Sequence, residues 1–108
     1  MAASQEYTDY ILELLSEIQN ISTHRMFGGV LLKVDGQQLG VLFKENLYFK
    51  VTTESLQEEF AQQGSTQFSY TRKDKATPVI IKNWWRVPDS YLDNSSEITK
   101  LALKVLAQ

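Results

Sequence analysis

Hydrophobic residues change their spacing several times along the chain, and each change predicts a new element. Near the N-terminus they recur every three or four positions, which predicts an amphipathic helix with Ser4 as its N-cap. The apolar stripe consists of Tyr7, Ile11, Leu14, Leu15 and Ile18. A second stripe, beside the apolar one, is entirely acidic and consists of Glu6, Asp9, Glu13 and Glu17. The acids near the helix start suit the positive end of its dipole.

The period then shortens to two, which is typical of strands that bury one face. A strand over Met26–Val34 is expected to turn back at Asp35-Gly36, a pair that tolerates the positive φ angles of a tight hairpin. The return strand covers Leu39–Phe43, and a third strand covers Leu47–Val51. Together these segments predict a three-stranded antiparallel meander.

A short helix is expected after the meander, with Thr53 as its cap and Gly64 as a left-handed stop. Two strands follow, one around Phe68 and Tyr70 and one over Val79–Val87. Strict alternation in the second of these strands separates two sets of side chains. One side would hold Val79, Ile81, Asn83, Trp85 and Val87, and the other Ile80, Lys82, Trp84 and Arg86.

The last helix follows the strand-breaking Val87-Pro88 pair. Asn94 and Glu97 have the spacing of a capping box, and the apolar positions after them recur at helical spacing. The predicted fold is therefore α+β: helix, three-stranded antiparallel meander, helix, two strands and C-terminal helix, with five strands in one sheet. We expect residues 1–108 to form a single domain, since this length suits one hydrophobic core.

Composition narrows the class of protein. The 108 residues include no cysteine, which excludes a disulfide scaffold, and 43% of them are hydrophobic, which is typical of a globular chain. No segment approaches the ~20 apolar residues of a membrane helix. The N-terminal residues lack the basic and apolar regions of a secretory signal, so we expect a cytoplasmic protein without a membrane partner.

The net charge of −2 averages two unlike regions. Residues 1–20 hold four acidic and no basic side chains, whereas residues 72–86 hold five basic side chains and one acidic side chain. This separation of acidic and basic regions either reflects two solvated faces or steers a charged partner.

The sequence contains few residues of the types that catalysis commonly uses. With no cysteine and with His24 as the only histidine, the chain has no thiolate nucleophile and no pair of histidines for zinc or acid–base work. His24 is expected to be an ordinary surface residue, although a lone base remains the alternative. Gly28-Gly29 lacks the context of a phosphate-binding loop and is interpreted as a structural pair. We therefore expect no enzyme, no cofactor and no metal.

Trp84-Trp85 is the most informative pair, because alternation turns one ring toward the core and the other away from it. The outer ring, Trp84, is either covered by the last helix or exposed beside cations, where a protein or single-stranded nucleic acid would stack on it. The candidate binding residues are Arg72, Lys73, Lys75, Lys82, Trp84 and Arg86.

Several of these segments together resemble a known family. Met26, Phe27, Gly28 and Gly29, the Leu47–Val51 strand and the Trp85–Pro88 element are similar to the N-terminal domain of the TfoX/Sxy family. Phe68 and Tyr70, spaced as Phe-x-Tyr-x-Arg, add to this resemblance, which extends over about residues 5–107. It implies an α+β fold and a structural role for the Met-Phe-Gly-Gly motif.

The resemblance also implies a function class. TfoX/Sxy proteins are bacterial regulators of natural competence that act on transcription as co-activators, and they usually carry a second, C-terminal domain. We expect this chain to be a stand-alone N-terminal domain. Two hypotheses follow: a non-enzymatic regulatory or adaptor domain that binds a protein, including a second copy of itself, or a nucleic-acid-binding module that uses residues 72–86.

Overall fold

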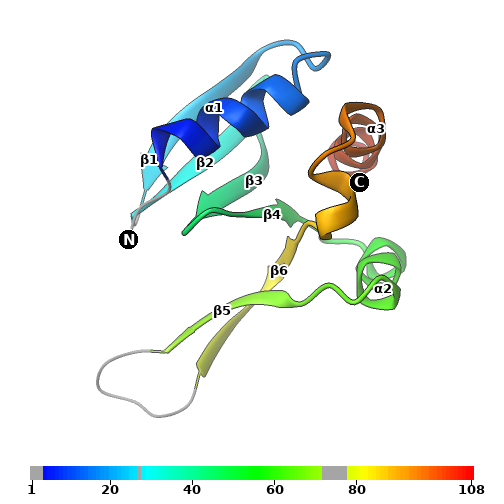
Figure 1. The fold of residues 1–108 in the computed structure, drawn as a ribbon. Coiled ribbons are helices and arrows are strands. Elements are labelled where there is room, and N and C mark those ends of the chain that lie inside the picture. The colour runs from blue at the N-terminus through cyan, green and yellow to red at the C-terminus, as the bar shows by residue number, and fades with distance from the viewer. Residues whose placement is uncertain (1–3, 27, 72–77) are drawn as a thin grey trace.

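Three helices and one antiparallel sheet make up the fold that a computed structural model gives for residues 4–26, 28–71 and 78–108 (Figure 1). The helices are α1 (Gln5–Leu14), α2 (Glu54–Gln62) and α3 (Ser95–Leu106), and a 3₁₀ turn, η1, spans Asp89–Tyr91. Within the described ranges, none of the helices is long and apolar enough to cross a membrane.

Local side-chain chemistry fixes two of the three helix starts. The Ser4 hydroxyl accepts a hydrogen bond from the Tyr7 amide at 3.1 Å, and Asn94 Oδ1 accepts one from the Glu97 amide at 3.1 Å. Thr53 stands at the N-cap of α2 but its side chain does not cap the helix. Instead, the Thr53 amide and hydroxyl donate to Gln108 Oε1 at 2.9 and 3.1 Å, which ties the start of α2 to the end of α3.

The sheet has six strands in the described residues, all joined to their neighbours in antiparallel fashion, in the order β1-β2-β3-β4-β6-β5. Their bounds are β1 Ile21–Met26, β2 Gly29–Val34, β3 Gln37–Phe43, β4 Asn46–Lys50, β5 Gln67–Thr71 and β6 Pro78–Arg86. The chain crosses over once, because β5 lies at the edge and β6 fills the place beside β4. The predicted α+β class is confirmed.

The predicted count of five strands is wrong, because the chain forms an additional strand, β1, before the glycine pair. The expected strand Met26–Val34 is two elements: Met26 ends β1 and pairs with Gly29, the first residue of β2. Gly28 lies between them with φ +77°, a left-handed conformation that glycine adopts without steric cost. The predicted hairpin at Asp35-Gly36 is present, with φ angles of 51° and 83°.

One face of the sheet carries the hydrophobic core, and all three helices pack on it. Val30, Leu32, Leu47 and Phe49 of the sheet are buried in one cluster. The helices supply the rest of that cluster with Ile11, Leu15, Leu56, Phe60, Ile98, Leu101, Ala102 and Val105. In Figure 1 the hairpin of β5 and β6 extends away from the helices. The opposite face of the sheet therefore has no helix over it in the described part of the chain.

Strand β6 departs from the strict alternation predicted for it. Neighbouring residues Gln67 and Phe68 of β5 pair with Trp85 and Ile81 of β6, so residues 82–84 form a bulge between these two pairs. The prediction that Ile81 and Trp84 lie on opposite faces is wrong, because the bulge rotates the strand and both side chains line the same hollow. Trp85 lies on the core side, where its ring centroid is 6.5 Å from that of Phe60.

Candidate functional site

A hollow of 530 Å³ opens on the face of the sheet that the helices leave uncovered. Strands β2, β3, β5 and β6 all contribute to it. Its lining consists of Gly29, Val41, Phe43, Phe68, Tyr70, Ile81 and Trp84. None of these seven residues is charged, and only Tyr70 and Trp84 carry a polar side-chain atom. Because 300–1,000 Å³ is typical of small-molecule sites, the hollow is large enough for one or two bulky apolar groups.

Aromatic rings hold one wall of the hollow in place. Phe68 meets Phe43 and Tyr48 edge to face, with ring centroids 5.3 and 5.0 Å apart. Tyr70 extends the same group at 6.2 Å from Phe68 and remains 43% exposed. Edge-to-face pairs add stability beyond burial alone, so the wall is formed before any ligand arrives.

Tyr48 lies beneath this wall, at the boundary between the aromatic group and Arg86. Burial raises the pKa of the Tyr48 phenol above its usual value, and the neighbouring Arg86 guanidinium opposes that rise. The phenol is therefore neutral at physiological pH and contributes a ring and a hydroxyl rather than a charge.

Glycine is required at the floor of the hollow. A Cβ atom at Gly29 would lie 2.6 Å from the Leu42 carbonyl oxygen and 3.4 Å from Phe43 Cδ1. Any side chain at Gly29 would therefore push β2 away from β3 and fill the space in front of Phe43. Of the family motif, Gly28 and Gly29 thus have backbone roles in the β1–β2 hairpin. The side chain of Met26 and all of Phe27 lie outside the described residues.

The predicted binding residues fall into three groups. Arg72, Lys73 and Lys75 lie outside the described residues. Trp84 lines the hollow and is partly exposed, and the C-terminal helix does not cover it, since α3 packs on the other face. Lys82, in the bulge between Ile81 and Trp84, is exposed to solvent.

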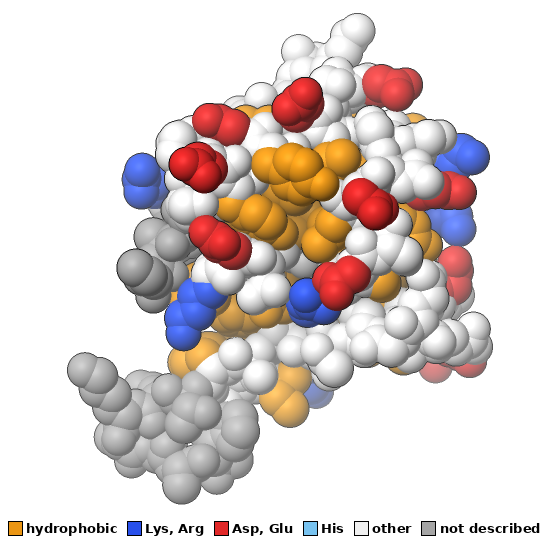
Figure 2. Space-filling model, in the orientation of Figure 1, with side chains coloured by type: hydrophobic (Ala, Val, Ile, Leu, Met, Phe, Trp, Pro, Cys, Tyr) orange, Lys and Arg blue, Asp and Glu red, His pale blue; other side chains and the backbone are white. Residues whose placement is uncertain are grey.

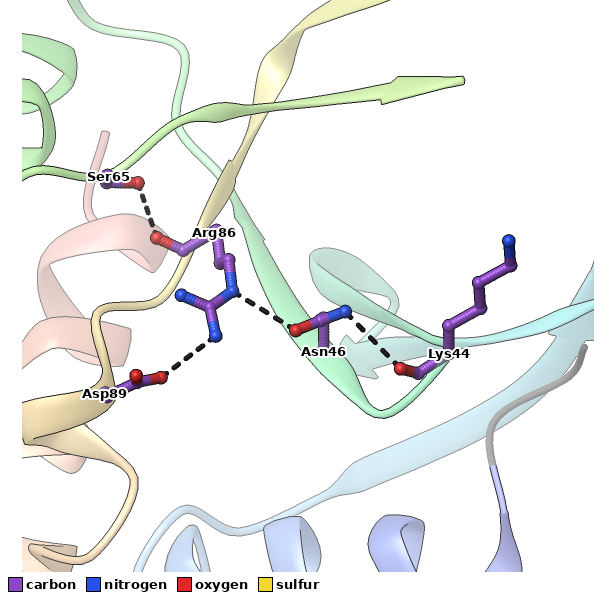
Figure 3. Close-up of polar contacts among 5 residues, drawn as sticks. All are labelled: Lys44, Asn46, Ser65, Arg86 and Asp89. Atoms are coloured by element: carbon purple, nitrogen blue, oxygen red, sulfur yellow. Dashed lines mark hydrogen bonds and ion pairs between the residues drawn. The ribbon is translucent and has the colours of Figure 1, made fainter. Parts of the chain in front are cut away.

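Arg86, the last predicted binding residue, is held by contacts within the chain (Figure 3). Its Nε donates to Asn46 Oδ1 at 3.1 Å and its Nη2 forms an ion pair with Asp89 at 2.9 Å. The Arg86 carbonyl accepts a hydrogen bond from the Ser65 hydroxyl at 2.5 Å. Arg86 thus joins β6 to the start of β4 and to η1, and Asp89 offsets its charge.

Charge is divided between the sheet and two of the helices. The six strands contain five basic residues and no acidic residue; the basic residues are Arg25, Lys33, Lys50, Lys82 and Arg86. Helices α1 and α2 each contain three acidic residues and no basic residue. In Figure 2 acidic side chains surround the region where α1 lies. The net charge of −2 therefore conceals a basic sheet and acidic helices.

Two further cations neighbour lining residues of the hollow, in addition to Lys82, which follows Ile81 in the β6 bulge. The Lys44 ammonium lies 5.5 Å from the ring centroid of Phe43, within reach of a cation–π contact. Lys50 pairs across the sheet with Trp84, and its ammonium donates to the neutral Gln38 Oε1 at 2.8 Å. Neither of these contacts offsets the positive charge. We use the name rim lysines for Lys44, Lys50 and Lys82.

The single histidine and the acidic residues of the described ranges do not gather as metal ligands. His24 is exposed on β1 and its Nε2 lies 3.2 Å from the Ser22 hydroxyl. Within the described ranges, no three His, Asp or Glu side chains come together as metal ligands. The uncovered face offers apolar surface and positive charge, which are means of binding.

Sequence reasoning identified Trp84 but did not predict the hollow around it. Val41, Phe43 and Ile81 were expected only as ordinary strand positions. The sequence of β3 does indicate a second apolar face. No residue from Leu39 to Phe43 is polar, whereas a strand with one solvated face alternates apolar with polar residues. Apolar residues at consecutive positions of a strand place apolar side chains on both faces of the sheet, so the second face also has apolar surface.

Comparison with known proteins identifies a family but no individual relative. No curated protein matches the chain. The model of the TfoX N-terminal domain matches residues 13–108, a segment that includes part of α1 and every other element described above. The motifs around the glycine pair and the paired tryptophans lie inside this match. The chain therefore belongs to the TfoX N-terminal domain family.

Proposed function

We propose that this protein is a non-enzymatic regulatory or adaptor domain that acts in the cytoplasm by binding another protein through the hollow on the uncovered sheet face. Family membership supports a regulatory role related to competence. The observation that carries the proposal is the apolar lining of the hollow, with Trp84 and Tyr70 partly exposed on a face without a helix.

Protein binding suits the chemistry of this face. Interfaces depend on a few large side chains that enter well-packed pockets, and Trp and Tyr are enriched among them. The hollow has the size for such an anchor, and its aromatic wall is already packed in the free chain, which would lower the ordering cost of binding. A regulatory domain of this type would recruit its partner without changing it chemically.

Site-specific photo-crosslinking in bacterial cells tests the proposal. A photoreactive phenylalanine analogue replaces Trp84 in one variant and Leu103 in another. Leu103 is the matched control because it is 53% exposed but lies on α3, in the layer on the other side of the sheet. We expect position 84 to give a discrete protein adduct that position 103 does not give. Equal labelling from both positions, or labelling from 103 alone, would contradict the proposal.

Nucleic-acid binding is the second candidate, favoured by one observation: aromatic residues Tyr70 and Trp84 lie on a sheet whose charged residues are all basic. Fluorescence anisotropy with single-stranded DNA at two salt concentrations tests it, because phosphate contacts weaken as salt rises. Binding that decreases with salt and with Lys82→Glu would support this function, and absence of binding at low salt would exclude it.

A further inference from the structure

The sign of the charges around the hollow specifies the chemistry of its partner. Each rim lysine neighbours a residue of a lining that has no charge of its own: Lys44 lies over Phe43, Lys50 pairs with Trp84, and Lys82 follows Ile81 in the β6 bulge. Glu45, beside Lys44 in the β3–β4 turn, is the acidic residue adjacent to them in sequence. A partner that places carboxylates around the hollow would gain electrostatic attraction, and a partner with basic residues there would be repelled.

A second copy of this chain does not satisfy that condition. Two uncovered faces placed against each other in a symmetric dimer would bring the rim lysines of both copies together. The acidic outer surfaces of α1 and α2 could meet the uncovered face of another copy, but that contact is head to tail. Head-to-tail contacts close only as rings and otherwise extend as filaments. The charge arrangement therefore favours a different protein.

We propose that the hollow binds an acidic amphipathic segment of another protein, with one or two large apolar side chains inside the hollow and carboxylates against the rim lysines. This inference rests on the proposed function and adds the chemistry of the partner. Trp84, Phe68 and Ile81 would surround the apolar anchor, while Lys50 pairs with Trp84 across the sheet and Lys82 lies in the bulge between Ile81 and Trp84. Lys44 lies over Phe43, which packs edge to face against Phe68 in the aromatic wall.

The lining favours a peptide over a nucleic acid, although both are anionic. A base inserted in the hollow would lose its hydrogen bonds to water and find only the Tyr70 hydroxyl and the Trp84 indole N–H among the lining side chains. A leucine or phenylalanine side chain has no such requirement. The ring of Phe68 is also engaged edge to face with those of Phe43 and Tyr48, so these three rings present no open stack of parallel faces.

A series of synthetic peptides tests the proposal with the intact chain. Three 16-residue peptides carry leucine and phenylalanine at helical spacing and differ only at the remaining positions, which are glutamate, glutamine or lysine. A fourth keeps the glutamates and replaces the apolar residues with alanine. A 16-nucleotide oligo-dT represents the nucleic-acid alternative. Titration followed by amide chemical shifts gives both the affinity and the residues that respond.

We expect the glutamate peptide to bind at least tenfold more tightly than the lysine peptide at 50 mM NaCl, and the difference to shrink as salt rises. The alanine peptide should lose most of the affinity, since the anchor supplies the binding energy. Shift changes should concentrate at Gly29, Val41, Ile81 and Trp84. Equal affinity for the glutamate and lysine peptides, changes centred on α3, or tighter binding of oligo-dT would overturn the proposal.

Matched variants separate charge from shape. Lys82→Glu should weaken the glutamate peptide about fivefold and strengthen the lysine peptide, whereas Lys100→Glu makes the same charge change on α3 and should alter neither. Trp84→Ala should weaken binding more than tenfold. Tyr70→Ala, at a side chain that is 43% exposed, gives a second test of the wall if Trp84→Ala unfolds the chain.

The two levels of the proposal fail in different ways. If crosslinking at position 84 captures a protein and the acidic peptides do not bind, the inference about partner chemistry is wrong and the proposed function stands. If neither experiment detects binding at this face, both are wrong. Light scattering at the concentrations used for titration checks for a second copy, and a stable symmetric dimer through this face would also overturn the inference.

Discussion

Substitution of Gly40 by alanine should destabilise the domain more than any other single-methyl change in the sheet interior. Gly40 lies in the central strand β3 opposite Phe49 of β4. A Cβ atom there would be 2.3 Å from the Tyr48 carbonyl oxygen and 2.9 Å from Phe49 Cδ1. The carbonyl belongs to the paired strand and cannot rotate away, so β3 and β4 must separate locally.

The magnitude follows from two contributions. Overpacking a close-packed interior costs about 1–3 kcal/mol, and weakening one ladder hydrogen bond costs about 1 kcal/mol more. We therefore expect Gly40→Ala to lower the free energy of unfolding by about 3 kcal/mol. For a domain of this size that corresponds to a fall of roughly 15 °C in Tm. Because the whole stability of such a domain is about 5–15 kcal/mol, the variant should still fold.

Urea unfolding followed by circular dichroism measures the loss, with Gly64→Ala as the control. Gly64 has φ +84° and open space around it, so alanine there meets backbone strain of about 1 kcal/mol without a collision. The two variants therefore separate strain from steric overlap. A Gly40→Ala loss no larger than that of Gly64→Ala would refute the reasoning.

Three further predictions concern stability. The buried Tyr7 hydroxyl has no hydrogen-bond partner among the described residues, so Tyr7→Phe should raise the free energy of unfolding by about 1 kcal/mol in urea titrations. Asn94→Ala removes the cap contact to the Glu97 amide and should lower Tm, with a loss of about 1 kcal/mol, measured by calorimetry. The pKa of Tyr48 is raised in the folded state by burial, so above the ordinary tyrosine value of 10.0 the unfolded phenol ionises first and stability should fall as pH rises. Tyr48→Phe should make that alkaline decline shallower, and an unchanged slope would show that other groups cause it.

Features set by nearby residues could be predicted from the sequence. Ser4 and Asn94 cap their helices through contacts three residues away, and the Asp35-Gly36 turn depends on its own φ angles. Each of these features depends only on residues that are close in sequence. The corresponding predictions are confirmed because no distant contact overrides them.

The strand β1 could not be predicted in the same way. Four of its residues, Ser22, Thr23, His24 and Arg25, are polar and exposed, so it has no apolar alternation to detect. Its place at the sheet edge explains this composition, because an edge strand next to solvent needs only one neighbour to satisfy its hydrogen bonds. Pairing with β2 is therefore a property of the folded sheet that a periodicity argument does not contain.

The hollow, like β1, could not be predicted from the sequence, because it depends on tertiary structure. It exists because a bulge at residues 82–84 brings Ile81 and Trp84 to one face, and no glycine or proline in these positions indicates that bulge. Alternation alone would have placed Trp84 beside Ile80. The candidate residue was therefore identified from its type, while its neighbours became known only from the pairing of β5 with β6.

All charged residues of the strands are basic, and their location on the sheet does not by itself explain why they share one sign. A face packed under helices excludes charge of either sign because burial penalises both, which explains why none of the charged strand residues is buried. It does not explain why all five are Lys or Arg, since Glu and Lys are both depleted in strands to a lesser degree than Asp or Pro. Mixed signs would also reduce repulsion within the sheet. The proposed acidic partner would account for the bias. Because the acidic helices α1 and α2 pack on the opposite face, its attraction would be directed to the side where the hollow opens.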